Sequence, residues 1–225
     1  MALYICTKRM KVLLLGASGR LGKEILKKLI GEGISTSILV RDRSKIALQS
    51  EHLSIFEGTP QNPADLAHAL SGCHRVVTTL NISRNSDFPW SKLRAPKTLL
   101  SDTITHLLSL APQHSLQKIV TVSAWGVHET KKDLPFWFRW LIDNSNIKYG
   151  YIDHERQEDI LVKSDLDWTI LRPVGLSNSQ KDKPVRVSFE GKPAGMLVSR
   201  KSVAAFIVDH LGRSDYSRKL VTLSQ

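Results

Sequence analysis

An α/β fold, in which helices flank a mostly parallel sheet, is predicted by three features of the sequence. Short apolar runs alternate along the chain with segments whose apolar residues recur at helical spacing. Three glycines, Gly16, Gly19 and Gly22, lie where the first apolar run meets the first helical segment. No internal repeat is visible beyond this alternation. The pattern is typical of successive strand–helix–strand units.

The first half of the chain follows this alternation closely. The apolar run at residues 11–16 is the first expected strand, and a helix at residues 21–33 follows it. The apolar residues of this helix share one face: Leu21, Ile25, Leu26 and Leu29. Gly31 and Gly33 are suited to end it. Three more strands and a short amphipathic helix are then expected, at residues 35–42, 52–58 and 75–80 and at residues 63–70.

The second half repeats the alternation. A helix at residues 97–111 leads into a strand at 118–124, and a helix at 153–164 leads into a strand at 167–173. We expect the remaining residues to form a small C-terminal extension on the substrate side, packed on the same sheet. Its elements are a strand at 185–191, a helix at 199–212 and a strand at 219–224.

Two irregular segments, residues 81–96 and 125–150, interrupt this pattern. Because each follows an expected strand, both should lie at the carboxyl edge of the sheet, where open α/β folds bind ligands. The second segment is rich in aromatic residues, which indicates a lid or the wall of a substrate pocket. The aromatic side chains of the two segments could stack on a planar substrate or only form the core of a lid: Trp90, Trp125, Phe136, Trp137, Phe138 and Trp140.

Composition is that of an ordinary globular protein, with 41% hydrophobic and 24% charged residues in a chain of 225. We expect residues 1–9 to be an N-terminal extension and residues 10–225 to form a single domain. The sequence has no long apolar run and no secretory signal, so a cytoplasmic location without membrane association is expected. The two cysteines, Cys6 and Cys73, have no metal-binding or redox spacing, and we expect no metal.

The net charge of +11 is spread along the chain instead of being concentrated in one segment. A nucleic-acid partner is therefore not expected, and a nucleotide cofactor accounts for part of the charge. The rest is expected to be a solvated basic surface. Both a monomer and a homodimer remain open.

The glycine run between the first strand and the first helix carries the main chemical signal. In this context Gly16 permits a tight turn, Gly19 lets backbone N–H groups approach phosphate oxygens, and Gly22 lets the helix pack closely on the strand. The motif therefore predicts a Rossmann-type, doubly wound sheet that binds a dinucleotide through this run: Gly16, Ser18, Gly19, Arg20, Leu21 and Gly22. The alternative is that the glycines only make a strand-to-helix turn.

Arg41 lies 19 residues after Gly22, where enzymes that use NAD place a carboxylate for the ribose hydroxyl. A guanidinium at this position suits the additional phosphate of NADP, and Arg43 and Arg20 add positive charge nearby. NADP(H) is therefore favoured, while Asp42 keeps NAD(H) possible. The alternative is that Arg41 and Arg43 are solvated loop charges.

Residues at the carboxyl ends of other strands should face the nicotinamide half of the cofactor. Ser123 could bind a substrate carbonyl group or the carboxamide, or could only end a strand. The other expected cofactor contacts are Thr59, Leu80, Asn81 and Pro173.

His154 should begin the helix at 153–164, with Asp153 as its N-cap. There it could donate a proton, although a lone histidine is more often structural. Glu155 and Glu158 are interpreted as the acidic first turn of this helix.

Four motifs resemble the atypical short-chain dehydrogenase/reductase superfamily: the glycine run, LVRDRSK, VTVSAWG and SDLDWTILRPVG. The segment DHERQEDILVKSDLDW is most similar to the NmrA-like NAD(P)H-binding group, which includes the biliverdin reductase B / flavin reductase family. The resemblance implies NADPH binding by the glycine run, with Arg41 at the adenosine phosphate and Leu80 and Ser123 near the nicotinamide.

The Tyr-x-x-x-Lys pair of ordinary short-chain dehydrogenases is missing. Gly150 and His154 occupy the two corresponding positions, and neither Tyr149 nor Tyr151 has a lysine four residues later. Alcohol dehydrogenation by such a pair is therefore not expected, whereas flavin and biliverdin reductases of this type can work without it.

Three functions follow from these patterns. The leading hypothesis is an NADPH-dependent oxidoreductase of a planar conjugated acceptor, with Ser123 and His154 as catalytic candidates. The alternative is a non-catalytic, NADP(H)-sensing regulator of the NmrA-like type. A nucleotide-sugar epimerase-like enzyme is less favoured, because the chain leaves little room for a sugar-binding domain and lacks the tyrosine.

Overall fold

The computed structural model describes residues 10–181 and 183–225, so the expected N-terminal extension at residues 1–9 lies outside the described part. Within these residues the main sheet has eight strands in the order β3-β2-β1-β4-β5-β6-β10-β8. Its strands are β1 (Lys11–Leu15), β2 (Ser35–Val40), β3 (Leu53–Glu57), β4 (Arg75–Thr78), β5 (Lys118–Val122), β6 (Asp167–Pro173), β8 (Arg186–Ser188) and β10 (Lys219–Ser224). All neighbours pair in parallel except β10 and β8, which are antiparallel. The predicted doubly wound α/β fold is confirmed.

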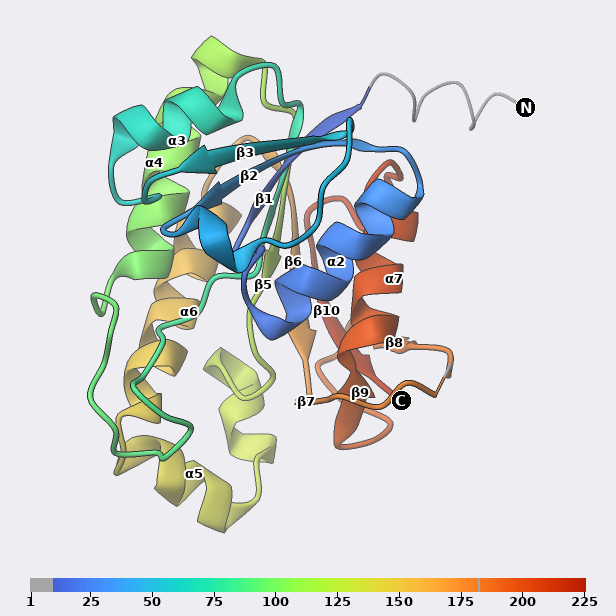
Figure 1. Cartoon of the computed structure of the whole chain (residues 1–225). Helices are drawn as coiled ribbons and strands as arrows, with labels where there is room; N and C mark the ends of the chain where they lie inside the picture. Colours follow the sequence, from blue (N-terminus) through green and yellow to red (C-terminus); the bar gives the residue numbers. More distant parts are fainter. Residues whose placement is uncertain (1–9, 182) are drawn as a thin grey trace.

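Helices cover both faces of this sheet (Figure 1). On one face lie α2 (Arg20–Gly31) and α7 (Arg200–His210). On the other lie α3 (Pro63–Leu70), α4 (Leu99–His114) and α6 (Ile147–Val162). A further helix, α5 (Phe136–Asp143), and two short 3-10 helices, η1 (Arg43–Lys45) and η2 (His128–Asp133), lie in the connections.

Strand β1 shows why its sequence is apolar at consecutive positions. Side chains alternate between the two faces of a strand, so Val12 and Leu14 enter the core beneath α2 and α7. Leu13 and Leu15 enter the core beneath α3, α4 and α6. All four side chains are fully buried. A strand covered on both faces therefore needs a continuous apolar run.

The C-terminal residues join the main fold more closely than a separate extension would. Strand β10 pairs in parallel with β6, β8 forms the edge beside it, and α7 packs on α2. A pair of short parallel strands was not predicted, β7 (Gly175–Ser177) and β9 (Leu197–Ser199).

Helix α6 differs most from its predicted bounds. It begins at Ile147, six residues before the expected start at Asp153, and Asn146 is its N-cap residue. Gly150 weakens the helix signal in these first turns, because glycine costs about 1 kcal/mol in a helix relative to alanine. Packing of α6 against α4 stabilises the longer helix. Asp153 and His154 therefore lie in its middle.

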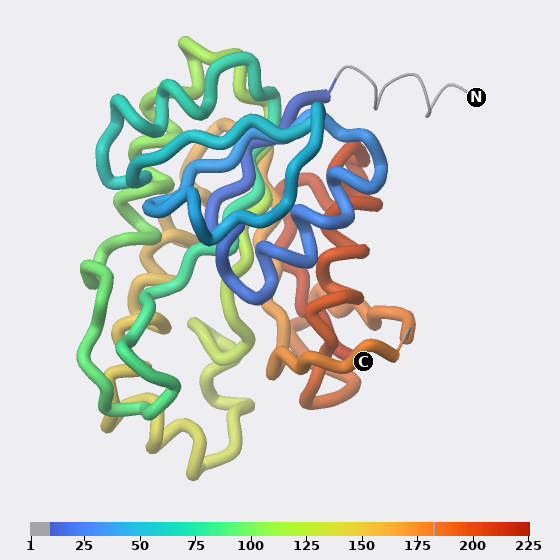
Figure 2. The backbone as a smooth tube through the Cα atoms, viewed as in Figure 1, coloured from blue at the N-terminus to red at the C-terminus, as the bar shows by residue number. Residues whose placement is uncertain are grey.

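The two irregular segments lie side by side, as Figure 2 shows for the chain around residues 81–96 and the start of α6. The indole N–H of Trp90 donates to the Asn144 carbonyl oxygen at 2.8 Å. The Asn146 amide donates to the Trp90 carbonyl oxygen at 2.9 Å, and its backbone N–H donates to that of Pro89 at 3.0 Å. In the described part of the chain, no helix is long and apolar enough to cross a membrane.

Candidate functional site

The loop between β1 and α2 depends on glycine at two positions. Gly16 has φ +86°, and a Cβ there would lie 2.6 Å from the Thr79 hydroxyl oxygen. A Cβ on Gly22 would lie 2.0 Å from the Gly16 carbonyl oxygen. The Gly19 N–H donates to that same oxygen at 2.9 Å. Larger residues at 16 or 22 cannot fit, so the close approach of helix and loop requires this glycine pattern.

This loop forms one wall of a cavity of about 710 Å³ at the carboxyl edge of the sheet. The other walls come from the ends of β2, β3 and β4, from residues 81–87 and 94–99, and from Leu176 and Arg200. The cavity lies beside β1 and β4, where the order of the strands reverses. Dinucleotides bind at such a reversal in doubly wound sheets.

The first cavity is strongly cationic. Its described lining includes six basic side chains: Arg20, Arg41, Lys45, Arg84, Arg94 and Arg200. Asp87 is the single carboxylate among these described lining residues, and it pairs with Arg20 at 3.5 Å. Burial and the nearby charge of Arg20 lower the pKa of Arg200. The cavity therefore suits an anionic ligand.

Asp42 does not take part in this lining. Its carboxylate accepts hydrogen bonds from the N–H and the hydroxyl of Ser44, at 3.0 and 2.6 Å, and so caps η1. The bonds from Ser44 lower the pKa of Asp42. Its other oxygen lies 3.5 Å from Lys45 Nζ, and Arg41 and Lys45 line the cavity whereas Asp42 does not.

A second cavity, of about 440 Å³, adjoins the first, and Asn81 and Leu176 line both. Its remaining walls come from the end of β5, from α5 and α6, and from residues 173–175 and Met196. Among the six aromatic residues of the irregular segments, Trp125, Trp137 and Phe138 line it. Trp90, Phe136 and Trp140 lie outside it and are exposed. The aromatic-rich segment therefore supplies one wall and an exposed outer surface.

Ser123 lies just beyond the end of β5 in the wall of the second cavity. Its backbone N–H donates to the Leu171 carbonyl oxygen at 2.7 Å. Its Oγ is buried, with no hydrogen-bond partner among the residues that the structure describes. A buried hydroxyl without a partner is costly, and a bound ligand that accepts a bond from it would remove that cost.

His154 lines the same cavity and is 4% exposed. The Thr121 hydroxyl donates to Gln157 Oε1 at 3.0 Å, which orients the amide so that its Nε2 donates to His154 Nδ1 at 2.7 Å. Burial lowers the pKa of His154 to about 4. The imidazole is therefore neutral near pH 7, with its proton on Nε2.

The comparison with protein families supports this arrangement. A family model described as NAD(P)H-binding matches residues 16–214, which span both cavities. The chain belongs to this NAD(P)H-binding family. This confirms the NAD(P)H-binding family that the sequence motifs indicated.

Two curated relatives of this NAD(P)H-binding chain have names that indicate enzymes. "Reductase pytE" of Aspergillus terreus is 29% identical over 124 residues, which are 47% of each chain. The uncharacterized sugar epimerase YhfK of Bacillus subtilis is 25% identical over 225 residues, 96% of this chain and 94% of that one. The chain thus matches about half the length of the first and nearly all of the second.

Solved structures share the fold at low identity. A short-chain dehydrogenase/reductase from Veillonella parvula in complex with NADP has a TM-score of 0.76 and 22% identity, covering 96% of this chain and 94% of that one. ChuY, an anaerobilin reductase from Escherichia coli O157:H7, has a TM-score of 0.78 and 17% identity, covering 96% and 97%.

Most residues predicted to bind the cofactor line the first cavity of this NAD(P)H-binding protein: Gly16, Ser18, Gly19, Arg20, Leu21, Gly22, Arg41, Thr59, Leu80 and Asn81. Ser123, Pro173 and His154 line the second cavity instead. Arg43 lines neither cavity; both it and Lys45 are exposed on η1, but only Lys45 lines the first cavity.

Sequence reasoning missed Lys45, Arg200, Leu176 and Met196. Lys45 follows Arg41 in the quoted LVRDRSK motif and had a sequence signal. The other three lie far along the chain and had none, because β7, β9 and α7 bring them to the cavities through tertiary contacts.

The predicted roles of Asp153 and Glu158 were wrong. Asp153 does not cap its own helix. Buried in the middle of α6, it accepts hydrogen bonds from the first turn of α4: the Leu100 N–H at 2.7 Å, and the N–H and hydroxyl of Ser101 at 3.4 and 2.5 Å. Glu158 is buried and paired with Arg172 at 2.6 Å, so it is not part of a solvated first turn.

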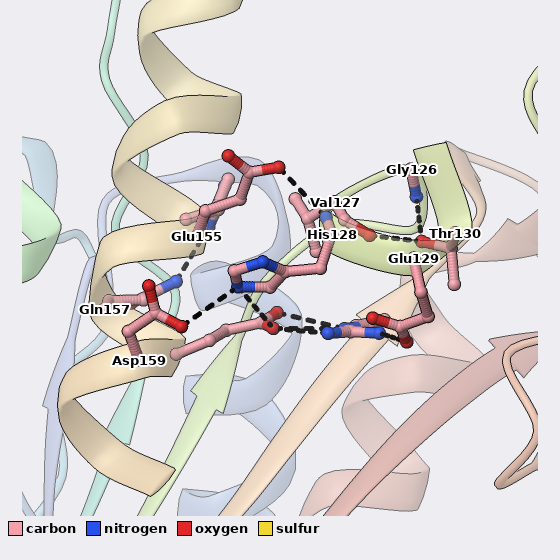
Figure 3. Close-up of polar contacts among 11 residues, drawn as sticks. Gly126, Val127, His128, Glu129, Thr130, Glu155, Gln157 and Asp159 are labelled. Atoms are coloured by element: carbon pink, nitrogen blue, oxygen red, sulfur yellow. Dashed lines mark hydrogen bonds and ion pairs between the residues drawn. The ribbon is translucent and has the colours of Figure 1, made fainter. Parts of the chain in front are cut away.

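An ion-pair network fastens η2 to α6, and Figure 3 shows Glu155 and Asp159 of α6 facing His128. Glu155 accepts the His128 N–H at 2.9 Å, and His128 Nε2 lies 3.5 Å from Asp159. Arg172 bonds both Glu158 and Glu129. The network links the segment after Ser123 to the helix that carries His154.

Proposed function

We propose that this protein is an NADPH-dependent oxidoreductase that reduces a planar conjugated acceptor, such as a flavin, a quinone or a related conjugated carbonyl compound. One observation carries the proposal. An aromatic-lined cavity adjoins the cationic cavity and presents the unpartnered Ser123 Oγ and the neutral His154 in its wall. The names of the reductase relative and of ChuY are consistent with this reaction class.

The first cavity has the features that NADPH requires. Gly16 and Gly22 keep open a cradle that a Cβ would fill, and the cations suit phosphate groups. In this proposal the backbone of residues 16–22 and Arg20 hold the diphosphate, and Arg41 and Lys45 hold the phosphate on the adenosine ribose. Asn81 and Leu176 would then border the nicotinamide and the acceptor.

The acceptor would gain two electrons and two protons. One proton would arrive together with both electrons, as a hydride that NADPH supplies in becoming NADP⁺. The second proton reaches the acceptor's oxygen or nitrogen from solvent. Ser123 and the His154 Nε2–H act as neutral donors that polarise that atom while charge develops on it. The aromatic wall would orient the ring of the acceptor.

Turnover tests the proposal. Purified protein should oxidise NADPH in the presence of at least one member of a panel of flavins and quinones. Ser123→Ala should lower kcat/KM about 10- to 100-fold, since it removes one donor. Ser37→Ala is the matched control, because Ser37 is fully buried but lines neither cavity. Equal losses in the two variants would contradict a role for Ser123.

We also propose a preference for NADP(H) over NAD(H). Arg41→Ala and Lys45→Ala should each weaken NADPH binding about 10-fold while changing NADH binding little, as calorimetry can measure. Arg43→Ala is the control, since Arg43 is exposed outside the cavity. A similar loss for both cofactors would argue against contact with the additional phosphate.

The same measurements distinguish two other functions from the proposed one. Binding of NADP(H) without turnover across the panel would favour a non-catalytic NADP(H)-sensing regulator, which the missing Tyr-x-x-x-Lys pair motivates. The name of YhfK raises sugar epimerisation. The apolar, aromatic second cavity and the presence of Gly150 where a catalytic tyrosine would lie favour the reductase instead.

A further inference from the structure

The two cavities differ sharply in charge. Six basic side chains line the first cavity. The second is lined, in the part of the chain that the structure describes, by aromatic, aliphatic and neutral polar residues, with no Asp, Glu, Lys or Arg. Its polar side chains are Asn81, Ser123, Tyr151 and His154.

The two titratable residues of this wall carry no charge near neutral pH. Burial raises the pKa of Tyr151 to about 12, so its phenol keeps its proton. Burial lowers the pKa of His154 to about 4, so its imidazole stays neutral. Each therefore offers a hydrogen-bonding group without a compensating charge.

Several of the charged residues near this cavity in the chain already have partners of their own. Lys131 of η2 pairs with Asp143 of α5 at 2.7 Å. Arg172 pairs with Glu158, and Asp153 accepts its bonds from α4. Asn81 and Leu176 line both cavities, and in the proposed function the nicotinamide half of the cofactor would lie at this border.

From this distribution of charge we propose that the second cavity selects an uncharged planar acceptor and discriminates against the same ring when it carries a carboxylate, sulfonate or phosphate. An anionic group on the ring would lose its hydration and find no cation in the wall. A neutral carbonyl oxygen or ring nitrogen would lose less hydration free energy on entering the cavity, and it could accept hydrogen bonds from Ser123 and His154. This inference rests on the proposed function but concerns binding, so it can be measured without turnover.

A matched pair of ligands tests it. Lumiflavin substituted on its ring with a carboxymethyl group is anionic, and the corresponding carboxamide is neutral and of nearly the same size. Binding of each is measured by calorimetry on protein saturated with NADP⁺, so that the anion cannot occupy the first cavity. The carboxamide should bind at least about 10-fold more tightly than the carboxylate.

A positive charge introduced in the exposed part of the cavity wall provides a second test. Met196 lines the cavity and is 53% exposed, so its replacement should not disturb folding. Met196→Lys should tighten binding of the carboxylate about threefold or more relative to the carboxamide. Met196→Gln is the neutral control of similar length, and it should leave the ratio of the two affinities as in the wild type.

Three results would overturn the inference: equal binding of the two ligands, no binding of either, or no response of the carboxylate to Met196→Lys. The proposed function is judged separately by oxidation of NADPH. Selective binding of the carboxamide without turnover of any acceptor would leave the charge selectivity standing and remove the reductase.

Discussion

The guanidinium of Arg172 forms a buried ion pair with the carboxylate of Glu158, and both side chains are 2% exposed. Nε donates to the two carboxylate oxygens at 3.1 and 3.2 Å, and Nη2 donates to Oε2 at 2.6 Å. Arg172 comes from the end of β6 and Glu158 from α6. Glu129 of η2 bonds the same guanidinium from the outer side. This pair therefore joins the sheet, the helix that carries His154 and the segment beyond Ser123.

Loss of either partner in this pair should be costly. Arg172→Met is expected to lower the free energy of unfolding by about 3–5 kcal/mol, because it leaves the buried Glu158 with only the more distant His128, at 3.8 Å. The double variant Arg172→Met/Glu158→Leu should recover much of this loss. Denaturant unfolding of the two single variants and the double variant measures the coupling. Additive losses would show that the two side chains do not stabilise the fold as a pair.

An exposed ion pair offers the comparison for this experiment. Lys131 and Asp143 lie 2.7 Å apart, but their side chains are 42% and 47% exposed. Asp143→Asn should change the free energy of unfolding by less than about 1 kcal/mol, because water screens such pairs.

The neutral, buried His154 should make stability depend on pH. Its pKa is about 4 in the folded protein and 6.5 for an ordinary histidine, so the unfolded chain binds the proton first as the pH falls. The resulting contribution is fully present above pH 6.5 and is lost as the pH falls toward 4, to a limit of about 3 kcal/mol. The free energy of unfolding of wild type and His154→Gln, measured across this range, isolates the effect. Parallel curves for the two proteins would refute it.

Two glycines of α2 should respond oppositely to the same substitution. A Cβ on Gly22 would lie 2.0 Å from a backbone oxygen, so Gly22→Ala should displace the loop and weaken NADPH binding more than 10-fold. A Cβ on Gly31 meets nothing within 4 Å among the described atoms. Gly31→Ala should leave NADPH binding unchanged and raise stability by up to about 1 kcal/mol. Calorimetric titration and thermal unfolding of both variants check this, and normal cofactor affinity in Gly22→Ala would contradict the packing argument.

Asp153 should contribute to stability through α4, although it lies on α6. Asp153→Ala leaves the N–H groups of Leu100 and Ser101 without this acceptor and leaves the Ser101 hydroxyl with only the Thr98 carbonyl oxygen. We expect a loss of about 2–4 kcal/mol in the free energy of unfolding. Asp153→Asn keeps one acceptor oxygen, so its free energy of unfolding should fall less than that of Asp153→Ala. The rate of amide hydrogen exchange at the start of α4 should rise in the alanine variant. An unchanged rate there would show that Asp153 does not stabilise the start of α4.

Local patterns in the sequence determined most of the fold. The bounds of α3 agree with the prediction, and the apolar run of β1 reflects burial on both faces of a parallel sheet. The glycine run also determined where the first cavity forms, because Gly16 and Gly22 are required by contacts within a few residues or with the neighbouring strand. Such signals are readable because backbone geometry and side-chain periodicity are local properties.

Tertiary structure alone decided the second cavity and the roles of the residues in α6. The acidic residues before and after His154 suggested a helix N-terminus, yet Asp153 caps another helix and Glu158 neutralises an arginine from β6. Leu176, Met196 and Arg200 reach the cavities from a part of the chain with no site motif. The sequence determined the tight, glycine-dependent turn at Gly16–Gly22. Whether a buried group is charged, paired or open to a ligand depends on neighbours distant in the chain, and only the folded protein brings these together.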